Sequence, residues 1–201
     1  MSKRFSIITL LLILKAGFFG DHFSGNTLQK WVVEKTSTLN IQGATNVNNF
    51  QCDVTEYLRA DTLFYTNTDG SGKLTFTNSS LTVDIKRFDC HSKMITSDFK
   101  NTLQADKNPT FKITFQSLDQ FANPCDNQVI NGIVDVGLTG VIKRTQISYI
   151  INTLPGNRIA LTGSHIFYFS DFNLKAPRKL GGLIRTKDQI KVNFKLLFRA
   201  V

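Results

Sequence analysis

The sequence lacks the signatures that identify most enzymes and nucleic-acid-binding proteins. It contains no GxSxG elbow, no HExxH motif, no glycine-rich phosphate loop and no close Asp/Glu pair in apolar surroundings. RNP, zinc-finger and helix-turn-helix patterns are absent as well. The three histidines, His22, His91 and His165, are too scattered to suggest a metal site. We therefore expect a non-enzymatic protein without metal or cofactor that does not bind nucleic acid; an enzyme with an unrecognised site is the weaker alternative.

Proline is also scarce, with 4 residues in 201, and no Pro/Gly/Ser-rich linker divides the chain. We therefore predict a single domain over residues 30–201. The chain is 41% hydrophobic and contains 17 phenylalanines but only one tryptophan. This is ample material for a core, and part of the aromatic carbon is available to face a ligand.

No hydrophobic run is long enough to span a membrane. Lys3 and Arg4 precede a ten-residue apolar run over residues 5–14, and Lys15 ends it well short of the roughly 20 residues that a span requires. The small residues Ala16 and Gly17 follow. This pattern predicts a signal peptide over residues 1–20 and a protein that is periplasmic or secreted. No cysteine lies near this boundary, so a lipoprotein anchor is not expected.

Acidic residues are outnumbered, 15 against 24 Lys and Arg. Without the predicted signal peptide the ratio is 15 to 21, a net charge of +6. The C-terminal region carries eight positive charges against Asp188 alone: Lys175, Arg178, Lys179, Arg185, Lys187, Lys191, Lys195 and Arg199. Two interpretations stay open. The charges form either the solvated outer face of a barrel or a surface that makes transient contact with an anionic membrane.

Cysteine occurs three times, and an odd number in an exported protein suggests one disulfide and one thiol. Cys52 and Cys90 each end an extended segment, where neighbouring strands can bring them together. Cys125, in the turn-like NPCDN, is the expected free thiol. A nucleophilic pair of Cys90 and His91 is disfavoured, because adjacent residues of a strand point to opposite faces.

Residues 81–118 alternate apolar and polar side chains on either side of a short helix. Leu81, Val83 and Ile85 recur at every second position, as do Phe111, Ile113 and Phe115, which is typical of strands with one buried face. Between them, we predict a helix with Ser97 as its N-cap and with Phe99 and Leu103 on one face. Pro109 is expected to end this helix and to restart a strand.

The same alternation predicts strands in the rest of the chain. They are residues 31–41 as one strand, 50–66 as one strand or a pair, 74–76 after a DGSG turn, 134–138, 147–151 before a PGN turn, 158–172 with a kink or bulge at Gly163, and 190–198. About eight to ten strands with one buried face must close or stack. We predict an all-β fold, an extended antiparallel β-barrel that is lipocalin-like, with about 8 strands and one or two short helices. Such a barrel holds side chains or one elongated ligand.

Four segments, in order, resemble the YceI-like family of exported, lipocalin-like polyisoprenoid-binding barrels. They are the strand from Trp31, VDIKRFDCHSKMITSDFKNTLQADKNPTFKITF (83–115), GIVDVGLTGVIKR (132–144) and IKVNFKLLFRA (190–200). The resemblance covers residues 31–200 and also implies the bridge between Cys52 and Cys90. It implies a pocket for an isoprenoid tail, such as that of a quinone or a polyprenyl phosphate, and a role in binding, storage or transport of such a lipid in the cell envelope.

The parity of the strands selects the residues that we expect to line this pocket. They are Phe76, Val83, Ile85, Phe111, Ile113, Phe115, Val136, Leu138, Tyr149, Ile151, Phe167, Val192, Phe194 and Phe198. His165 shares a face with Phe167 and is interpreted as a hydrogen-bonded wall histidine. The alternative to a carrier is an interaction protein of the envelope with a packed barrel and a basic docking face. Exposed strand edges permit a homodimer in either case.

Overall fold

The computed structural model describes residues 28–54, 56–67, 72–119 and 126–201, which fold mainly into β-strands. The predicted signal peptide and Cys125 lie outside these residues. The strands are β1 (Gln29–Val33), β2 (Thr38–Thr45), β3 (Asn49–Val54), β4 (Thr62–Asn67), β5 (Leu74–Thr77), β6 (Ser80–Asp84), β7 (Thr110–Leu118), β8 (Gln128–Leu138), β9 (Val141–Leu154), β10 (Arg158–Tyr168), β11 (Arg178–Lys179) and β12 (Ile184–Ala200). The helices are α1 (Lys93–Thr102) and three short 3-10 helices, η1 (Ile85–Arg87), η2 (Phe169–Phe172) and η3 (Leu180–Gly182).

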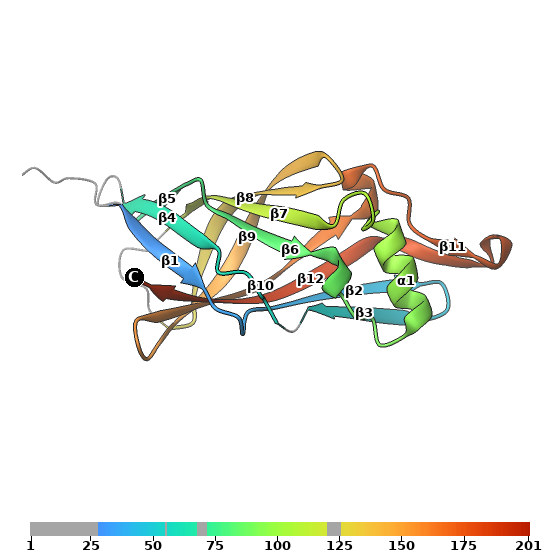
Figure 1. Cartoon of the computed structure of the whole chain (residues 1–201), viewed down its shortest axis with the longest axis horizontal. Helices are drawn as coiled ribbons and strands as arrows, with labels where there is room; N and C mark the ends of the chain where they lie inside the picture. Colours follow the sequence, from blue (N-terminus) through green and yellow to red (C-terminus); the bar gives the residue numbers. More distant parts are fainter. Residues whose placement is uncertain (1–27, 55, 68–71, 120–125) are drawn as a thin grey trace, which may run out of the picture.

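Eight strands form a closed antiparallel ring. The molecule as a whole is elongated (Figure 1). The order of the strands in the ring is β1, β4, β5, β7, β8, β9, β10 and β12, and β12 pairs back with β1. The predicted all-β barrel of about eight strands is therefore confirmed, and so is the short helix. A closed ring leaves no unpaired strand edge at this end of the molecule.

The barrel is extended because the strands β7 and β12 change partners along their length. Near Ala200, β12 pairs with β1, whereas its middle pairs with β2. Near Leu118, β7 pairs with β5, whereas its beginning near Thr110 pairs with β6. The strands β2, β3 and β6 therefore continue the wall beyond the ring, toward the end where α1 lies (Figure 1).

A disulfide between Cys52 and Cys90 closes this second half of the wall, which confirms the predicted pairing. It joins β3 to the segment between η1 and α1. Beside it, Asp53 and Asp89 form an antiparallel bridge, in which each backbone N–H donates to the other residue's carbonyl oxygen at 2.8 and 3.1 Å. The covalent bond and one bridge thus replace a continuous strand ladder at this position.

The first predicted strand, over residues 31–41, is wrong as a single strand, because the chain turns a corner between β1 and β2. At this corner the side chain of Ser37 accepts from the backbone N–H of Leu197 at 2.9 Å, and Ser37 is buried. Buried residues keep the same parity on both sides of the corner, at Trp31, Val33, Ser37 and Ile41, and the exposed Lys35 is the one interruption between them. Residues 50–66 form a pair of strands, β3 and β4, one of the two predicted outcomes.

The predicted helix is present, but its boundaries are wrong. Ser92, not Ser97, is the N-cap, and Ser97 lies inside α1. The cause is a tertiary contact, since the backbone N–H of Cys90 donates to the Thr96 side chain at 2.9 Å and thus fixes the chain directly before the helix. The helix ends at Thr102, well before Pro109, which precedes β7. Among the described helices, none is long and apolar enough to cross a membrane.

Gly163 is not a bulge toward β12, because β10 and β12 pair without a register shift across it. It lies instead where β10 leaves β9, since the pairing of these strands ends at Thr162. A Cβ atom at Gly163 would lie 2.7 Å from both the Ser148 carbonyl oxygen and a ring carbon of Phe194. The glycine therefore allows a close approach of strand and side chain.

Aromatic rings fill the closed end of the barrel. The Trp31 side chain is fully buried, with ring centroids 4.7 Å from Tyr65, 5.9 Å from Phe76 and 5.4 Å from Phe198. Phe115 continues this aromatic plug at 5.5 Å from Phe76. The plug makes the ring end a packed core.

Candidate functional site

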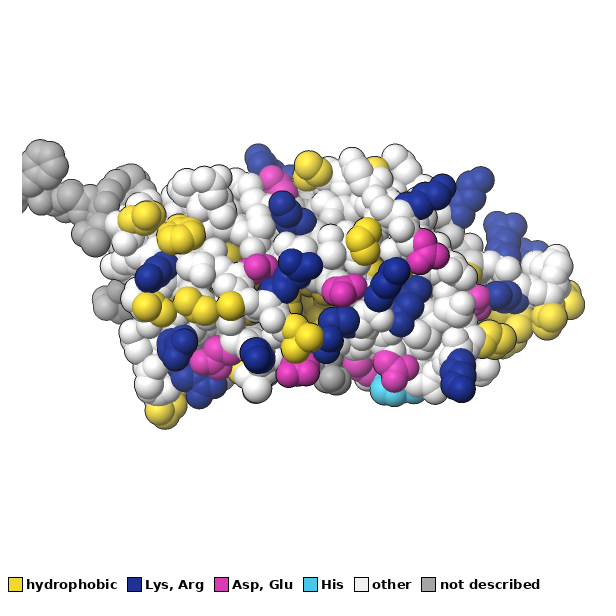
Figure 2. Space-filling model, in the orientation of Figure 1, with side chains coloured by type: hydrophobic (Ala, Val, Ile, Leu, Met, Phe, Trp, Pro, Cys, Tyr) yellow, Lys and Arg dark blue, Asp and Glu magenta, His cyan; other side chains and the backbone are white. Residues whose placement is uncertain are grey.

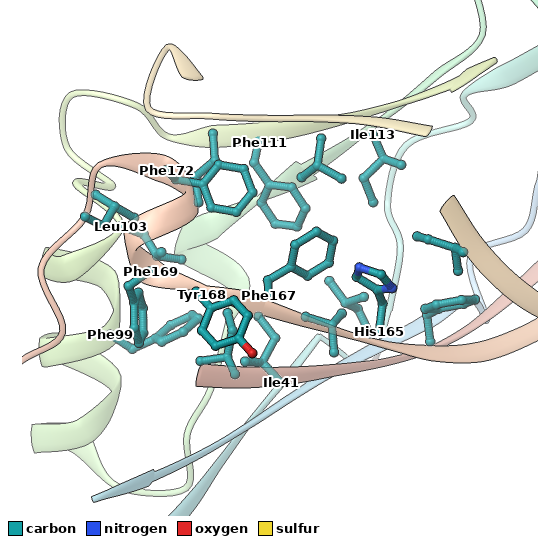
Figure 3. Close-up of a pocket in the computed structure, with 18 of the residues that line it drawn as sticks. Ile41, Phe99, Leu103, Phe111, Ile113, His165, Phe167, Tyr168, Phe169 and Phe172 are labelled. Carbon is teal, nitrogen blue, oxygen red and sulfur yellow. The ribbon is translucent and has the colours of Figure 1, made fainter. Parts of the chain in front are cut away.

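A carbon-lined cavity of about 90 Å³ lies on the other side of the aromatic plug, inside the barrel half that α1 covers (Figure 3). Its walls are β2, β7, β8, β9, β10, η2 and β12. The lining residues are Leu39, Ile41, Phe99, Leu103, Phe111, Ile113, Phe115, Val136, Leu138, Ile147, Tyr149, His165, Phe167, Tyr168, Phe169, Phe172, Leu174, Ile190, Val192, Phe194 and Leu196. An almost entirely apolar space of this kind suits an apolar ligand or ligand segment.

Nine of the fourteen residues predicted from parity line this cavity. They are Phe111, Ile113, Phe115, Val136, Leu138, Tyr149, Phe167, Val192 and Phe194. They come from five strands that are widely separated in the sequence, so the barrel brings them together as the alternation indicated. Whether they contact a ligand stays a prediction.

The other five predicted residues point inward but do not line the cavity. Phe76 and Phe198 belong to the aromatic plug. Val83, Ile85 and Ile151 are buried in the core elsewhere. Parity determines which face of a strand a residue occupies, but it gives no information on the depth of that residue along the barrel axis.

Twelve lining residues were absent from the predicted set. They are Leu39, Ile41, Phe99, Leu103, Ile147, His165, Tyr168, Phe169, Phe172, Leu174, Ile190 and Leu196. Ile147, Ile190 and Leu196 share parity with predicted neighbours and could have been included on that signal. Phe169 and Phe172 lie in η2, where strand parity no longer applies.

Tyr149 brings a hydroxyl group into this apolar space. Its side chain is 2% exposed and packs against the Phe194 ring at a centroid distance of 5.4 Å. Burial raises the pKa of Tyr149, so the hydroxyl is neutral. The structure shows no hydrogen bond between the Tyr149 hydroxyl and another described residue, and burial is the one cause of its raised pKa. It is thus a donor available to a polar group of a bound molecule.

His165 is another polar residue of the lining, and its imidazole is hydrogen-bonded within the barrel wall. Its Nε2 lies 3.1 Å from the Thr145 hydroxyl, which confirms the interpretation as a hydrogen-bonded wall histidine. Burial lowers the pKa of His165, and the positive charge of Lys143 lowers it further. The imidazole is therefore neutral at neutral pH, and the cavity keeps an uncharged lining.

Polar side chains connect β9 to β10 and η2 beyond the point where the pairing of β9 with β10 ends. Besides Thr145 and His165, they include the ion pair between Lys143 and Asp171. Burial alone would raise the pKa of Asp171, but hydrogen bonds from Lys143 and from the Tyr168 backbone N–H outweigh it and hold the pKa below its usual value. Side chains thus close the wall where the backbone ladder is missing.

No group of three or more metal-ligating side chains occurs in the described part of the chain. The pair of Cys90 and His91 is not a nucleophilic site, because Cys90 is bonded to Cys52. His91 instead contacts the Asp53 carboxylate at 2.6 Å through Nε2. The chemistry that the site offers is burial of carbon, with the hydroxyl groups of Tyr149 and Tyr168 as polar groups of the lining.

Solved structures with the same architecture are found at low sequence identity. A polyisoprenoid binding domain from Saccharophagus degradans, implicated in plant cell wall breakdown, matches with a TM-score of 0.63 at 13% identity, over 85% of this chain and 98% of that one. Burkholderia cenocepacia BcnA matches with a TM-score of 0.56 at 12% identity, over 80% of this chain and 95% of that one. A mutant of the Campylobacter jejuni YCEI protein matches with a TM-score of 0.50 at 15% identity, over 67% of this chain and 78% of that one.

No known family profile and no curated protein matches the sequence. At the identities above, the structural likeness shows the fold alone. The chain therefore has the YceI-like fold, and the resemblance seen in its sequence is confirmed at that level.

Proposed function

We propose that this chain is a non-enzymatic carrier that binds an isoprenoid or a similar long-chain lipid, and stores or transports it in the cell envelope. The observation that carries the proposal is the carbon-lined cavity next to the aromatic plug. The description of a similar structure as a polyisoprenoid binding domain supports it. A disulfide is typical of exported proteins, in agreement with the expected signal peptide.

The energetics favour a long apolar ligand. Each CH₂ group that leaves water contributes about 0.8 kcal/mol, so a few isoprene units suffice for strong binding without polar contacts. The neutral state of His165 fits this role, because an uncompensated charge would penalise an apolar neighbour. The Tyr149 hydroxyl adds a site for one polar atom, such as a quinone carbonyl oxygen.

Native mass spectrometry of the mature protein, purified from its own envelope without detergent, tests carriage directly. We expect a bound mass that extracts into organic solvent as a prenyl or other long chain. A protein that is free of ligand and that also refuses added quinones and polyprenyl phosphates would overturn the proposal.

A cavity-filling substitution localises the binding. Val136→Phe places a ring in the cavity, because Val136 lines it and is 8% exposed. We expect the affinity for a prenyl chain to fall at least tenfold, which corresponds to the loss of about two CH₂ contacts. Ile133→Phe is the matched control, since Ile133 lies on the outer face of the same strand and is 36% exposed. Equal affinities of the two variants would place binding outside the cavity.

The alternative function is an envelope interaction protein with a packed barrel. The small unfilled volume and the aromatic plug favour it, because most of the interior is occupied by the protein's own side chains. This alternative predicts the ligand-free mass and no effect of Val136→Phe on any lipid.

A further inference from the structure

A short hairpin projects beyond α1 at the end of the molecule opposite to the aromatic plug (Figure 1). This finger, residues 178–184, consists of β11, η3 and the beginning of β12, paired through Lys179 and Ile184. Its tip carries Leu180 and Leu183, which are 70% and 75% exposed. Two large apolar side chains at the end of a projecting hairpin are suited to enter another apolar phase.

The backbone of the hairpin tip adopts a conformation that is unfavourable for one of its leucines. Leu180 has φ 51°, a left-handed conformation that a bulky side chain rarely adopts. Gly181 and Gly182 follow with φ 63° and 96°, where glycine is the favoured residue. An asparagine at 180 would fit this backbone better than leucine does. The leucine therefore serves something other than the stability of the turn.

The finger and the residues that flank it are also strongly basic. Residues 173–187 contain five Lys and Arg and no Asp or Glu, and all five are exposed: Lys175, Arg178, Lys179, Arg185 and Lys187. Lys179 pairs with Asp98 of α1 at 2.7 Å. Figure 2 shows hydrophobic side chains at the outer end of this region with Lys and Arg beside them. Apolar residues bordered by cations are complementary to an anionic lipid surface.

A groove of about 300 Å³ lies beneath the finger, between α1 and the connection of β2 to β3. Val47 and Met94 line its outer part and are 58% and 66% exposed. At its inner side, Phe99 and Phe169 line both this groove and the barrel cavity. Two side chains thus separate the apolar interior from the groove at the finger.

We propose that the finger docks this end of the barrel onto an anionic membrane surface, with Leu180 and Leu183 inserted among the lipids. The basic residues contact the head groups, and the groove then faces the bilayer. The choice of a lipid surface over a protein partner rests on the proposed carrier function, because the groove leads to the apolar cavity of the barrel.

Sedimentation of the mature protein with vesicles tests docking alone. We expect binding to vesicles of phosphatidylglycerol and phosphatidylcholine that weakens with added salt, and little binding to phosphatidylcholine alone. Leu180→Asn with Leu183→Asn should lower the partition coefficient at least tenfold. Arg178→Gln with Lys187→Gln should lower it by a similar factor.

Matched controls lie elsewhere on the surface. Ile142→Asn with Val129→Asn removes apolar side chains of comparable exposure, 73% and 58%, from the barrel wall. Lys30→Gln with Arg199→Gln removes two exposed charges at the end with β1. Both controls should bind vesicles as the parent does.

The proposal would be overturned if the protein did not bind vesicles, or if the controls lost as much vesicle binding as the finger variants. It would also be overturned if the finger bound a protein partner and no vesicles. A protein that docks but carries no lipid in native mass spectrometry would refute the carrier function and leave docking in place.

Discussion

At the scale of single residues, the Tyr149 hydroxyl lies in an apolar lining without a hydrogen bond to another described residue. A buried hydroxyl without a partner costs free energy on folding. We therefore predict that Tyr149→Phe raises the free energy of unfolding of the ligand-free protein by about 1 kcal/mol, as measured by urea denaturation. The same change should weaken binding of a prenylated quinone about tenfold but leave binding of a plain hydrocarbon chain unchanged.

Tyr57 supplies the matched control for this prediction. Its hydroxyl donates to the Asp61 carboxylate at 2.5 Å and accepts from the Thr82 backbone N–H at 2.9 Å. Tyr57→Phe should therefore lower the free energy of unfolding by about 1 kcal/mol, since the Asp61 carboxylate loses one donor and keeps the Thr82 backbone N–H at 2.8 Å. If both variants shift stability in the same direction, the hydroxyl of Tyr149 has a partner in solution.

At the scale of elements, the disulfide joins two segments of the barrel wall that are otherwise paired by the single bridge of Asp53 with Asp89. Cys52 and Cys90 are 38 residues apart, and a crosslink over such a loop contributes up to about 4 kcal/mol on the chain-entropy model. We predict that Cys52→Ala with Cys90→Ala lowers the free energy of unfolding by about 2 to 4 kcal/mol in urea denaturation. The barrel should still form, because the pairing of Asp53 with Asp89 remains.

The odd cysteine provides the control for the disulfide. Cys125→Ala should leave both the free energy of unfolding and its response to a reducing agent unchanged. The double variant should lose its response to the reducing agent, whereas the parent keeps it. Loss of that response in Cys125→Ala would show that Cys125 takes part in the pairing in solution.

Strand type was predictable in this chain because one face of each strand is buried. The alternation around Val192 and Tyr149 marks β12 and β9 directly. Boundaries were less predictable, because tertiary contacts set them. The break after β1 depends on the contact of Ser37 with Leu197, and the start of α1 depends on the contact of Thr96 with Cys90. Neither contact has a local sequence signal.

The candidate site was predictable in its faces but not in its depth. Phe115 and Phe76 have the same inward orientation, yet only Phe115 lines the cavity. The difference arises because the two residues lie at different positions along the barrel axis, one end of which is packed while the other contains the cavity. The contributions of Phe99 and Phe169 depend on how α1 and η2 close the barrel, and strand parity cannot describe them.

At the scale of the whole molecule, the interior divides into two parts with different roles. The ring end is packed with aromatic side chains. The opposite end, where α1 and β11 lie (Figure 1), contains the cavity, the groove and the finger. Stability and binding are thereby separated along the axis, because the plug holds the ring together while the other half is covered by α1. A ligand that reaches the cavity from the groove must pass Phe99 and Phe169.

Phe99 should therefore control the rate of exchange more than the affinity. We predict that Phe99→Leu speeds both uptake of a fluorescent prenyl analogue from vesicles and its release, each on the order of tenfold, as a barrier lower by about 1.4 kcal/mol gives. The dissociation constant should change little, because both rates rise together. Phe172→Leu is the matched control, since Phe172 is equally buried and lines the cavity but not the groove. It should not speed uptake, and its dissociation constant should change as little as that of Phe99→Leu, because both residues line the cavity. Equal acceleration in both variants would place the path of the lipid elsewhere in the wall.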